Sequence, residues 1–530
     1  MELRLDPEIP VTRVVNGHNV FNKGYHHGLR GKTYEEYYGK ERAVEIRKRH
    51  SEALKGHRYW SNGNAHAFAC IAITPEGKWY RFDSITQAAQ KLNLNYAMTQ
   101  QENNKLQIFL TMQYILNAPE TINATIDLPA SKSISNRALI INALAGNGIM
   151  PDNLSDCDDT EVILDALRDM PDTIDIKAAG TAMRFMTAYL AVTPGTHLLT
   201  GTERMKQRPI KVLVEALRYL GADISYEGND GYPPLRINGK KLEGGSIEIP
   251  GDVSSQYISA LLMVAPVMEK GLELKLTGDI ISRPYIDLTL CTMIDFGAEA
   301  EWLGSDTIKV EPKPYSPRPY FIENDWSAAS YWYEMLAING NEESEIKLTG
   351  LTDGSRQGDS AVKYLFSMLG IKTIFETREP GVPTTVTLKR ISMASDRLDY
   401  DFINQPDMVQ TFVVCCCMMN RPFCFTGLSS LRIKETDRIE ALKTEMRKLG
   451  YVIEETSPGE LRWDGTRCEP EPGAAINTYE DHRMAMAFAP AAIKIPGLRI
   501  NDPQVVSKSY PNFWLDLTRA GFAIGEEAGA

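Results

Sequence analysis

The 530-residue chain has no apolar stretch long enough to cross a membrane. Its longest apolar segments, near Ile258–Met268 and Phe412–Met419, are far shorter than the ~20 residues that a spanning helix needs. The first ten residues, MELRLDPEIP, carry four charges and no apolar segment, so we expect no secretory signal.

Cysteine pairs with the spacing of metal ligands are also absent. The eight cysteines include Cys415, Cys416 and Cys417 in a row. This pattern disfavours a zinc site or a disulfide framework, and it favours a reducing, cytoplasmic location.

Histidine and net positive charge are scarce in the larger part of the chain. Beyond residue 111 only His197 and His482 remain of the eight histidines. Residues 1–111 hold 16 Lys and Arg against 11 Asp and Glu, whereas the other 419 residues hold 41 against 58. This asymmetry indicates two segments with different partners. The length predicts two or more domains, and 43% hydrophobic residues are ordinary for a globular protein.

What the larger segment does contain is a repeat of an amphipathic helix, a glycine and a short strand. One copy is common in any α/β protein, but here five follow at intervals of 76, 73, 80 and 71 residues. Glycine suits a left-handed helix C-cap, and the alternation that follows it suits a half-buried strand. With an earlier copy that has Pro171 instead, the repeat predicts two domains of three units, with ligands bound between them. The glycines are Gly221, Gly297, Gly370, Gly450 and Gly521.

Four polar stretches gather cations in this otherwise acidic segment. The first, LPASKSISNRA, places Lys132, Ser133 and Arg137 at a helix start, where side chains and free N–H groups can bind an anion. In the second, AAGTAMRFM with the later ERMKQRP, Gly180 lets the backbone approach a ligand and Arg208 matches a carboxylate or phosphate. The alternative for the first stretch is a capped helix with solvated charges.

The third stretch, VSSQY with the later SRPY, offers hydroxyl and amide donors for phosphate oxygens, although serine-rich turns also occur without ligands. In the fourth, KETDR, helical spacing would place Lys434 and Arg438 on one face, where they would lower the pKa of Glu435. Arg483 and Lys508 follow in segments apolar enough to be buried, where cations need anionic partners. A salt-bridged surface helix is the alternative.

The motifs SKSISNRA, AGTAMR, RP, SSQ, SRPY, KETDR, DHRMAM and SKSYP, in this order, resemble the 5-enolpyruvylshikimate-3-phosphate synthase family from about Met112 to the C-terminus. The resemblance implies an α/β enolpyruvyl transferase fold of two domains, each built from three βαβαββ units. One domain would comprise 112–130 and 325–530, and the other 131–324. Residues 1–111 would form a small α+β extension.

The family transfers the enolpyruvyl group of phosphoenolpyruvate to the 5-hydroxyl of shikimate 3-phosphate, in the biosynthesis of chorismate and aromatic amino acids. The resemblance assigns shikimate 3-phosphate to Lys132, Ser133, Arg137, Ser254, Ser255, Gln256, Ser282, Asp407 and Lys434. It assigns phosphoenolpyruvate to Lys132, Gly180, Arg208, Gln256, Arg438, Arg483 and Lys508.

The resemblance also assigns the catalytic groups. Asp407 in INQPDMVQ and Glu435 in KETDR would be the acid and base, with Lys132 beside them, and which carboxylate moves which proton stays open. No metal or organic cofactor is implied, because phosphoenolpyruvate already carries the activated group. The family habit is a monomer. The chain departs from the family pattern at Ala178, Phe185, Ser430 and Trp326, which leaves the reaction class unchanged.

Residues 31–60 and 78–95 resemble the basic modules attached to homing endonucleases, the second with the first helix of a helix-turn-helix. They predict contacts with DNA phosphates, and a solvated basic helix is the alternative. No nuclease catalytic set is evident there. The predicted contacts are Arg47, Lys48, Arg49, Lys55 and Arg58.

Two other functions stay open at this point. The sister transferase that acts on UDP-N-acetylglucosamine shares the fold, but it has Lys-Asn in place of SKS and uses a loop cysteine, for which only Cys157 is near. A DNA-binding protein with an inactive transferase domain would explain the basic N-terminus, but every charged position of the transferase site is filled.

Overall fold

The computed structural model describes residues 112–528 except 147–148, 380 and 393–394, together with five short strands before them. Contacts divide the chain into two compact units, Met1–Thr111 with Ala528–Ala530, and Met112–Glu527. In the first unit, β1 (Leu3–Arg4), β3 (Lys78–Phe82) and β2 (Cys70–Ile73) pair in that order, and β4 (Ala97–Met98) pairs with β5 (Ile108–Phe109). The predicted DNA-contact residues and the helix of the second module lie outside the described residues.

The second unit contains five four-stranded sheets among its described residues. Three are each built by a continuous βαβαββ segment, and each of the other two takes one strand, β6 (Met112–Asn117) or β7 (Asn123–Asp127), from the start of this unit. The first segment is β8 (Thr173–Asp175), α6 (Gly180–Val192), β9 (Gly195–Thr200), α7 (Lys211–Tyr219), β10 (Asp223–Tyr226) and β11 (Leu235–Gly239). The second is β12 (Gly245–Pro250), α8 (Ser255–Val264), β13 (Leu272–Thr277), α9 (Arg283–Asp295), β14 (Ala300–Trp302) and β15 (Thr307–Val310).

Three further segments complete the set. One is β7 (Asn123–Asp127), α10 (Trp326–Asn339), β16 (Glu345–Leu351), α11 (Val362–Met368), β17 (Ile371–Phe375) and β18 (Thr384–Arg390). The next is β19 (Leu398–Asp401), α12 (Val409–Met418), β20 (Phe423–Thr426), α13 (Arg438–Lys448), β21 (Glu454–Ser457) and β22 (Glu460–Trp463). In the last, β23 (Ala475–Ile476), α14 (His482–Phe488), β24 (Leu498–Asn501), α15 (Phe513–Arg519) and β25 (Ala523–Ala528) are joined by β6 (Met112–Asn117).

The five glycine copies of the repeat occupy the same place in each segment. Every one of these glycines has a positive φ, between 85° and 104°, at the end of the second helix. The strand that follows is the edge strand of its sheet in all five cases. The predicted left-handed cap is therefore confirmed. More and less exposed residues alternate along β10, β14 and β17, as predicted for a half-buried strand, whereas β21 is mostly exposed.

The earlier copy, with Pro171, behaves differently. Its helix α5 (Asp158–Asp169) ends at Met170 in the left-handed conformation, but β8 then pairs in parallel with β9 as the first strand of a segment. Helices α4 (Lys132–Leu144) and α5 lie outside the five segments. The chain around them pairs only through single bridges, Ala130 with Asn324 and Asp152 with Phe321.

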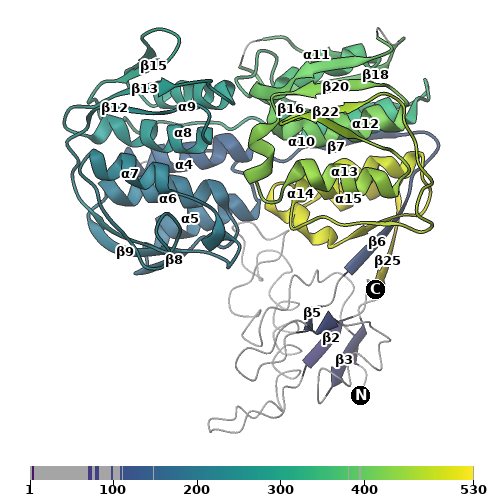
Figure 1. The fold of residues 1–530 in the computed structure, drawn as a ribbon, viewed down its shortest axis with the longest axis horizontal. Coiled ribbons are helices and arrows are strands. Elements are labelled where there is room, and N and C mark those ends of the chain that lie inside the picture. Colours follow the sequence, from purple (N-terminus) through teal and green to yellow (C-terminus); the bar gives the residue numbers. More distant parts are fainter. Residues whose placement is uncertain are drawn as a thin grey trace, which may run out of the picture. The chain divides into compact units, whose positions relative to one another are not determined.

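Helices that are apolar on nearly every side form the centre of each half of this unit. Helices α4, α6 and α8 pack on one another in one half, and α12 packs on both α10 and α14 in the other (Figure 1). Most residues of α6 and all residues of α12 are buried, as expected for helices without a polar face. Two large apolar cores define two lobes. The core of lobe I is drawn from Leu116–Leu128 and Trp326–Phe522, and that of lobe II from Leu139–Tyr315; all of α4 is counted with lobe II, because it packs on α6, α8 and α9. A third, small cluster consists of Ala130, Ile134, Ala138, Leu288 and Ile322.

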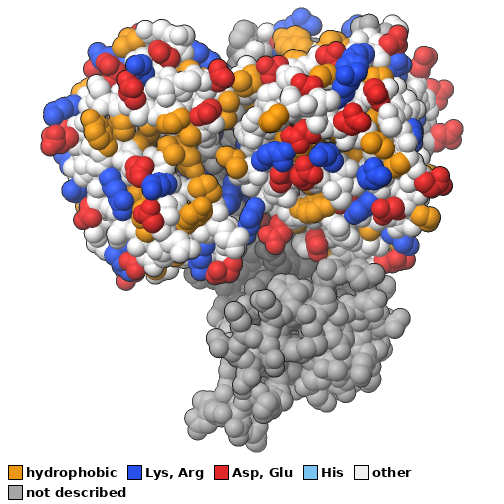
Figure 2. Space-filling model, in the orientation of Figure 1, with side chains coloured by type: hydrophobic (Ala, Val, Ile, Leu, Met, Phe, Trp, Pro, Cys, Tyr) orange, Lys and Arg blue, Asp and Glu red, His pale blue; other side chains and the backbone are white. Residues whose placement is uncertain are grey.

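Among the helices that the structure describes, none combines the length and the apolar character needed to cross a membrane. On the face shown in Figure 2, acidic and basic side chains are interspersed rather than separated. Exposed ion pairs of this unit, such as Lys309 with Glu311 and Lys313 with Glu299, each contribute little to stability.

Candidate active site

The start of α4 holds Lys132 beside a buried carboxylate. Ser131 caps the helix, and its Oγ accepts a hydrogen bond from the backbone N–H of Ile134 at 3.4 Å. The Nζ of Lys132 lies 3.2 Å from Asp159 Oδ2, and its side chain is only 15% exposed. Burial, the largest single effect, would lower the pKa of Lys132, but Asp159, Cys157 and Glu435 together outweigh it and the pKa is raised. Lys132 is therefore a buried, charged group, not a solvated charge at a helix cap.

Arg137, one turn later on α4, already has most of its donors engaged. Its Nε donates to Thr289 Oγ1 at 2.7 Å, and its Nη1 donates to the carbonyl of Ser133 at 2.8 Å. Its Nη2 donates to Ser259 Oγ and to the carbonyl of Tyr285, each at 3.2 Å. Because one N–H of the five stays unused, Arg137 mainly holds α4 against α8 and α9 and can offer a ligand one further donor.

The first residue of α6, Gly180, allows Arg208 to approach closely. A Cβ at Gly180 would lie 2.6 Å from Arg208 Nη1, so no other residue fits here without moving the guanidinium. The backbone carbonyls of Gly180 and Pro209 accept hydrogen bonds from Arg184, at 3.1 and 3.2 Å. Among the described residues, no carboxylate lies within salt-bridge distance of Arg208, whose buried Nε has no hydrogen-bond partner. Arg208 is therefore a cation held ready for an anion.

The serine-rich stretch lies at the start of α8. Ser254 caps this helix, with its Oγ accepting from the N–H of Gln256, and Gln256 Nε2 donates to Thr181 Oγ1 at 3.1 Å. Ser282 caps α9 in the left-handed conformation, with a φ of 54°, and its N–H donates to the carbonyl of Ile403 in lobe I. These donors thus lie at two helix N-termini, which favour anions.

The KETDR stretch is not helical, contrary to the prediction. Helix α13 begins at Arg438, with Asp437 as its cap, and Lys434 ends the 3-10 turn Ser429–Ile433. Lys434 and Arg438 nevertheless converge on one oxygen, Asp407 Oδ1, at 3.4 and 2.8 Å. Because Asp437 caps α13, the helix starts after Lys434. The two cations therefore meet at one carboxylate, that of Asp407, and not on one face of a helix.

Asp407 is surrounded by three cations from two stretches of the chain, Lys434 and Arg438 of KETDR and Arg483 of α14. Arg483 Nη2 lies 3.0 Å from its second oxygen, opposite Lys434 and Arg438. Burial alone would raise the pKa of Asp407, but Arg483 and Lys434 outweigh it and hold the pKa well below its usual range. Asp407 is therefore ionised at neutral pH.

Glu435 has an equivalent environment on the other side of Arg438. Its carboxylate lies 2.9 Å from Arg438 Nη2 and 3.5 Å from Lys508 Nζ. Burial is again outweighed, here by Lys508 and Arg438, so the pKa of Glu435 is also held well below its usual range. Arg208 of lobe II acts on it in the same direction. Both candidate acid–base groups are thus unprotonated before substrates bind.

Arg438 is the buried centre of this network. Its Nε and Nη2 donate to the two oxygens of Asp481, at 2.7 and 3.3 Å, while its other contacts reach Asp407 and Glu435. The pKa of Arg438 is raised, because Asp481 and Glu435 outweigh the effect of burial. A guanidinium with three carboxylate partners is fixed in position, as a preorganised site requires.

Three carboxylates and one imidazole at this site were not assigned from the sequence. Asp159 and Asp481 occur inside the motifs LSDCDD and EDHRMAM, so doubled or clustered acids were their only signal. Asp359 gave none. His482 is 2% exposed with no hydrogen bond to either ring nitrogen, and burial together with Lys132 holds its pKa well below the usual range, so its ring is neutral.

The structure brings the two lobes' charged residues together. Glu435 of lobe I raises the pKa of Lys132 of lobe II, and the pKa of Glu435 is lowered both by Arg208 of lobe II and by Lys508 of lobe I. The Arg204 guanidinium donates to the Glu435 carbonyl at 3.4 Å, which joins the lobes directly. The cations outnumber the carboxylates, six to five, so the site has an affinity for anions. The cations are Lys132, Arg208, Lys434, Arg438, Arg483 and Lys508, and the carboxylates are Asp159, Asp359, Asp407, Glu435 and Asp481.

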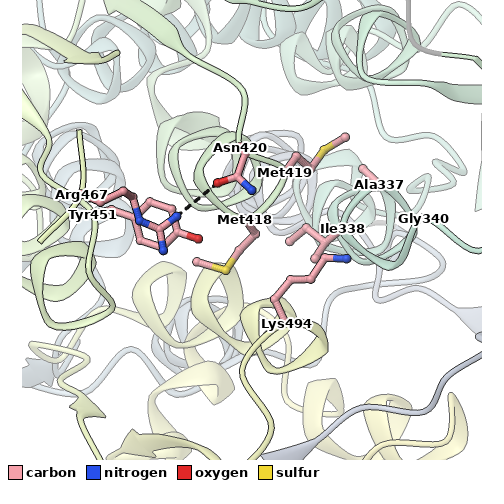
Figure 3. Close-up of a pocket in the computed structure, with 9 residues that line it drawn as sticks. All are labelled: Ala337, Ile338, Gly340, Met418, Met419, Asn420, Tyr451, Arg467 and Lys494. Carbon is pink, nitrogen blue, oxygen red and sulfur yellow. Dashed lines mark hydrogen bonds between the residues drawn. The ribbon is translucent and has the colours of Figure 1, made fainter. Parts of the chain in front are cut away.

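A separate pocket of about 440 Å³ opens in lobe I and contains none of these residues (Figure 3). It lies where α10 and α12 end, and Arg467 donates there to Asn420 Oδ1 and to the carbonyl of Gly450. Lys494 completes its rim. These cations face helix C-termini, whose partial negative charge they offset, so we assign the pocket no part in the chemistry.

The residues from 116 onward match a known family. The sequence model of EPSP synthase (3-phosphoshikimate 1-carboxyvinyltransferase) matches residues 116–174 and 170–517. A 3-phosphoshikimate 1-carboxyvinyltransferase of Bacteroides fragilis is 58% identical over 418 residues, which cover 78% of this chain and 100% of the relative. Its namesake in Shewanella halifaxensis is 36% identical over 437 residues, covering 76% of this chain and 98% of the relative.

Solved structures show the same fold. EPSP synthase from Acinetobacter baumannii superposes with a TM-score of 0.63 at 20% identity, over 79% of this chain and 100% of that one. The enolpyruvyl transferase NikO from Streptomyces tendae gives 0.60 at 14% identity, over 80% and 100%. The predicted α/β enolpyruvyl transferase fold is therefore confirmed, and this chain belongs to the EPSP synthase (3-phosphoshikimate 1-carboxyvinyltransferase) family.

Proposed function

We propose that the charged site between the lobes transfers the enolpyruvyl group of phosphoenolpyruvate to the 5-hydroxyl of shikimate 3-phosphate and releases phosphate. The family of the chain has this activity, as a step of the shikimate pathway to chorismate and the aromatic amino acids. The observation that carries the proposal is the excess of buried cations around two ionised carboxylates. Two substrates that together bring two phosphates and two carboxylates supply the missing negative charge.

Phosphoenolpyruvate takes the part of the site nearest Arg208. That guanidinium has no carboxylate partner among the described residues, and Gly180 leaves it room. Lys132 and Lys508 lie on the same side, each with one carboxylate partner. The full proposed set for this substrate is Lys132, Gly180, Arg208, Gln256, Arg438, Arg483 and Lys508.

Shikimate 3-phosphate takes the part lined by the helix starts of lobe II. Its phosphate would be bound at the caps of α8 and α9, and its 5-hydroxyl would lie near Asp407. The full proposed set is Lys132, Ser133, Arg137, Ser254, Ser255, Gln256, Ser282, Asp407 and Lys434. Arg137 contributes through its one unused N–H.

Asp407 and Glu435 are the proposed acid–base pair, with Lys132 as an electrostatic catalyst. Addition requires that a base accept the 5-hydroxyl proton while an acid gives a proton to C3 of the enol. Both carboxylates are ionised in the free site, so either one can be the base and the acid must be protonated on substrate binding. The anionic substrates favour this, because they neutralise the cations that keep the carboxylates ionised.

We propose that the two lobes are the domains of the transferase, 112–130 with 325–530 and 131–324. Hydrogen bonds such as Ser507 Oγ to Asp158 Oδ2 at 2.7 Å hold them in contact. Closure of this kind excludes water from a reactive intermediate. We also propose that the protein is a cytoplasmic monomer, as is usual in the family.

Residues 1–111 have a proposal of their own, contact with nucleic acid. Two observations support it. These residues hold 16 basic against 11 acidic side chains, and they precede the family match, which begins at residue 116. Salt-dependent retention of the full chain on DNA, lost in a chain that begins at Met112, is the corresponding measurement.

A phosphate-release assay tests the transfer. The expected result is phosphate release that needs both phosphoenolpyruvate and shikimate 3-phosphate. Release with UDP-N-acetylglucosamine in place of shikimate 3-phosphate, or with phosphoenolpyruvate alone, would contradict the proposal. The sister reaction has little support in the structure, because the Cys157 thiol is fully buried and burial raises its pKa.

A further inference from the structure

The segment Arg356–Asp359 of lobe I lies along α9 of lobe II, and every residue in it has a contact at the border. Arg356 Nη1 lies 2.6 Å from Asp295 Oδ2 at the end of α9. A Cβ on Gly358 would lie 2.5 Å from the Cβ of Pro284, so only glycine allows this approach. Asp359 Oδ1 accepts a hydrogen bond from the Tyr285 hydroxyl at 2.9 Å.

Gln357 ties the same segment to both places where the chain passes between the lobes. Its Oε1 accepts from Ser131 Oγ at 2.9 Å and from the N–H of Trp326 at 3.2 Å. Its Nε2 donates to the carbonyl of Asn324 at 2.9 Å. The segment is therefore fixed at the crossing on one side and reaches α9 on the other.

Asp359 is the buried end of this segment. It is 2% exposed, and its second oxygen accepts a hydrogen bond from Ser327 Oγ on α10. Arg483 and Asp407 of the candidate active site act on Asp359 through their charge. Tyr285 stands three residues after Ser282, whose N–H donates to Ile403 of lobe I.

We propose that Asp359 is a positioning residue, which holds Tyr285 and the start of α9 in the closed arrangement that binds shikimate 3-phosphate. This rests on the proposed function, because it concerns how that substrate's half of the site is assembled. Asp359 touches no substrate in this account. It acts through the Tyr285 hydroxyl, and Gly358 provides the close backbone approach that makes the bond possible.

A measurement of folding stability distinguishes this positioning role of Asp359 from a role in stabilising the folded core. Burial raises the pKa of Asp359 to about 6, above its ordinary value of 3.8, so the folded protein disfavours the ionised form. Ionisation of Asp359 therefore lowers the free energy of unfolding. This destabilisation grows as pH rises from about 3.8 to about 6 and is complete at pH 7. Removing the charge should therefore leave the folded state as stable at pH 7, or more stable, while binding is impaired.

The test uses the full chain and measures KM for shikimate 3-phosphate, kcat and the urea midpoint at pH 7. Asp359→Ala is expected to raise this KM on the order of 10- to 100-fold, the effect of one hydrogen bond to a charged group. Asp359→Asn keeps an acceptor for Tyr285 and should recover most of the loss. Gly358→Ala, which adds only a methyl group against Pro284, should raise the same KM with the KM for phosphoenolpyruvate less affected.

A double-mutant cycle shows whether Asp359 acts through Tyr285. Added to Tyr285→Phe, Asp359→Ala should change KM by less than about twofold, because the bond is already lost. Asp353→Asn is the matched control: it alters a carboxylate six residues earlier, which pairs with Lys363 inside lobe I, and should change nothing.

Three results would overturn the proposal: independent effects in the cycle, unchanged KM in both Asp359→Ala and Gly358→Ala, or loss of folding in both Asp359 variants. The last would assign Asp359 to the core. Each is distinct from a failure of the proposed function, in which the unsubstituted protein itself releases no phosphate.

Discussion

Glu334 is a carboxyl group that α10 buries completely, with no hydrogen-bond partner for either oxygen. Burial raises its pKa well above the ordinary value of 4.5, so it is protonated in the folded protein at moderate pH. Cys415 and Cys416 of α12 lie close enough that a negative charge on Glu334 would raise the pKa of their thiols. Stability should fall as pH rises above about 4.5, because only the unfolded chain can then ionise this group freely.

Replacing Glu334 by methionine, which has similar volume, should raise the free energy of unfolding at pH 7 by about 1–3 kcal/mol, the usual cost of an unsatisfied buried polar group. Urea unfolding across pH 5–8 measures it: the variant should lose the decline with pH and keep its kcat. The exposed Glu343→Gln is the control and should match the unsubstituted protein. A methionine variant less stable than the original would mean that Glu334 has a partner, such as bound water, that stabilises it.

Individual site residues could be predicted from the sequence where a motif held them, but their partners could not. Lys132, Arg208 and Arg483 were found because each lies in a short polar motif. Asp159, 27 residues from Lys132, and Asp359, 74 residues from Tyr285, are partners chosen by the fold. Pairs at such separations leave no local pattern, since only helix and strand periods do.

At the scale of elements, the start of α6 determines where Arg208 lies. Arg184, in the first turns of that helix, donates to the carbonyls of Gly180 and Pro209, so it joins the helix to the residue that follows Arg208. Burial lowers the pKa of Arg184 to about 10, so its guanidinium still carries a proton at neutral pH. Its role here rests on its N–H donors, which bind the carbonyls of Gly180 and Pro209.

Arg184→Met should therefore raise KM for phosphoenolpyruvate by roughly 10-fold, the effect of about one lost hydrogen bond, and leave KM for shikimate 3-phosphate nearly unchanged. Initial rates with each substrate varied in turn measure both. Arg218→Met is the matched control, since Arg218 holds α7 to the Ile224 carbonyl in the same lobe and away from the site. Equal changes in the two KM values would contradict the role of Arg184.

The elements themselves could be predicted where glycine marked them. Gly221, Gly297 and the later copies indicated the helix end, because a positive φ is a local requirement, and the alternation after them indicated a strand; the position of that strand at the sheet edge was not predicted. The helix predicted through KETDR was wrong, because Asp437 is a better cap than an interior residue and starts α13 one residue later. The copy at Pro171 was recognised as a helix end, but strand direction depends on β9, far along the chain.

In the whole molecule, the two lobes contribute opposite halves of one charged site. The repeat predicted the two halves, and the clusters of cations in the polar motifs predicted anionic ligands. What the sequence did not show is how the lobes meet: the contacts of Arg204 with Glu435, Ser507 with Asp158, and Gly358 with Pro284 follow from tertiary packing alone. The predicted DNA contacts before residue 112 lie outside the described residues.

The most direct test of the central claim, that Asp407 acts as an acid or base among fixed cations, is the rate of phosphate release by Asp407→Asn with both substrates saturating. Loss of proton transfer should lower kcat by about 10²–10⁴-fold. The KM values should stay equal or fall, because Arg438, Arg483 and Lys434 lose a competing anion. A variant that retained nearly the original kcat would contradict the account.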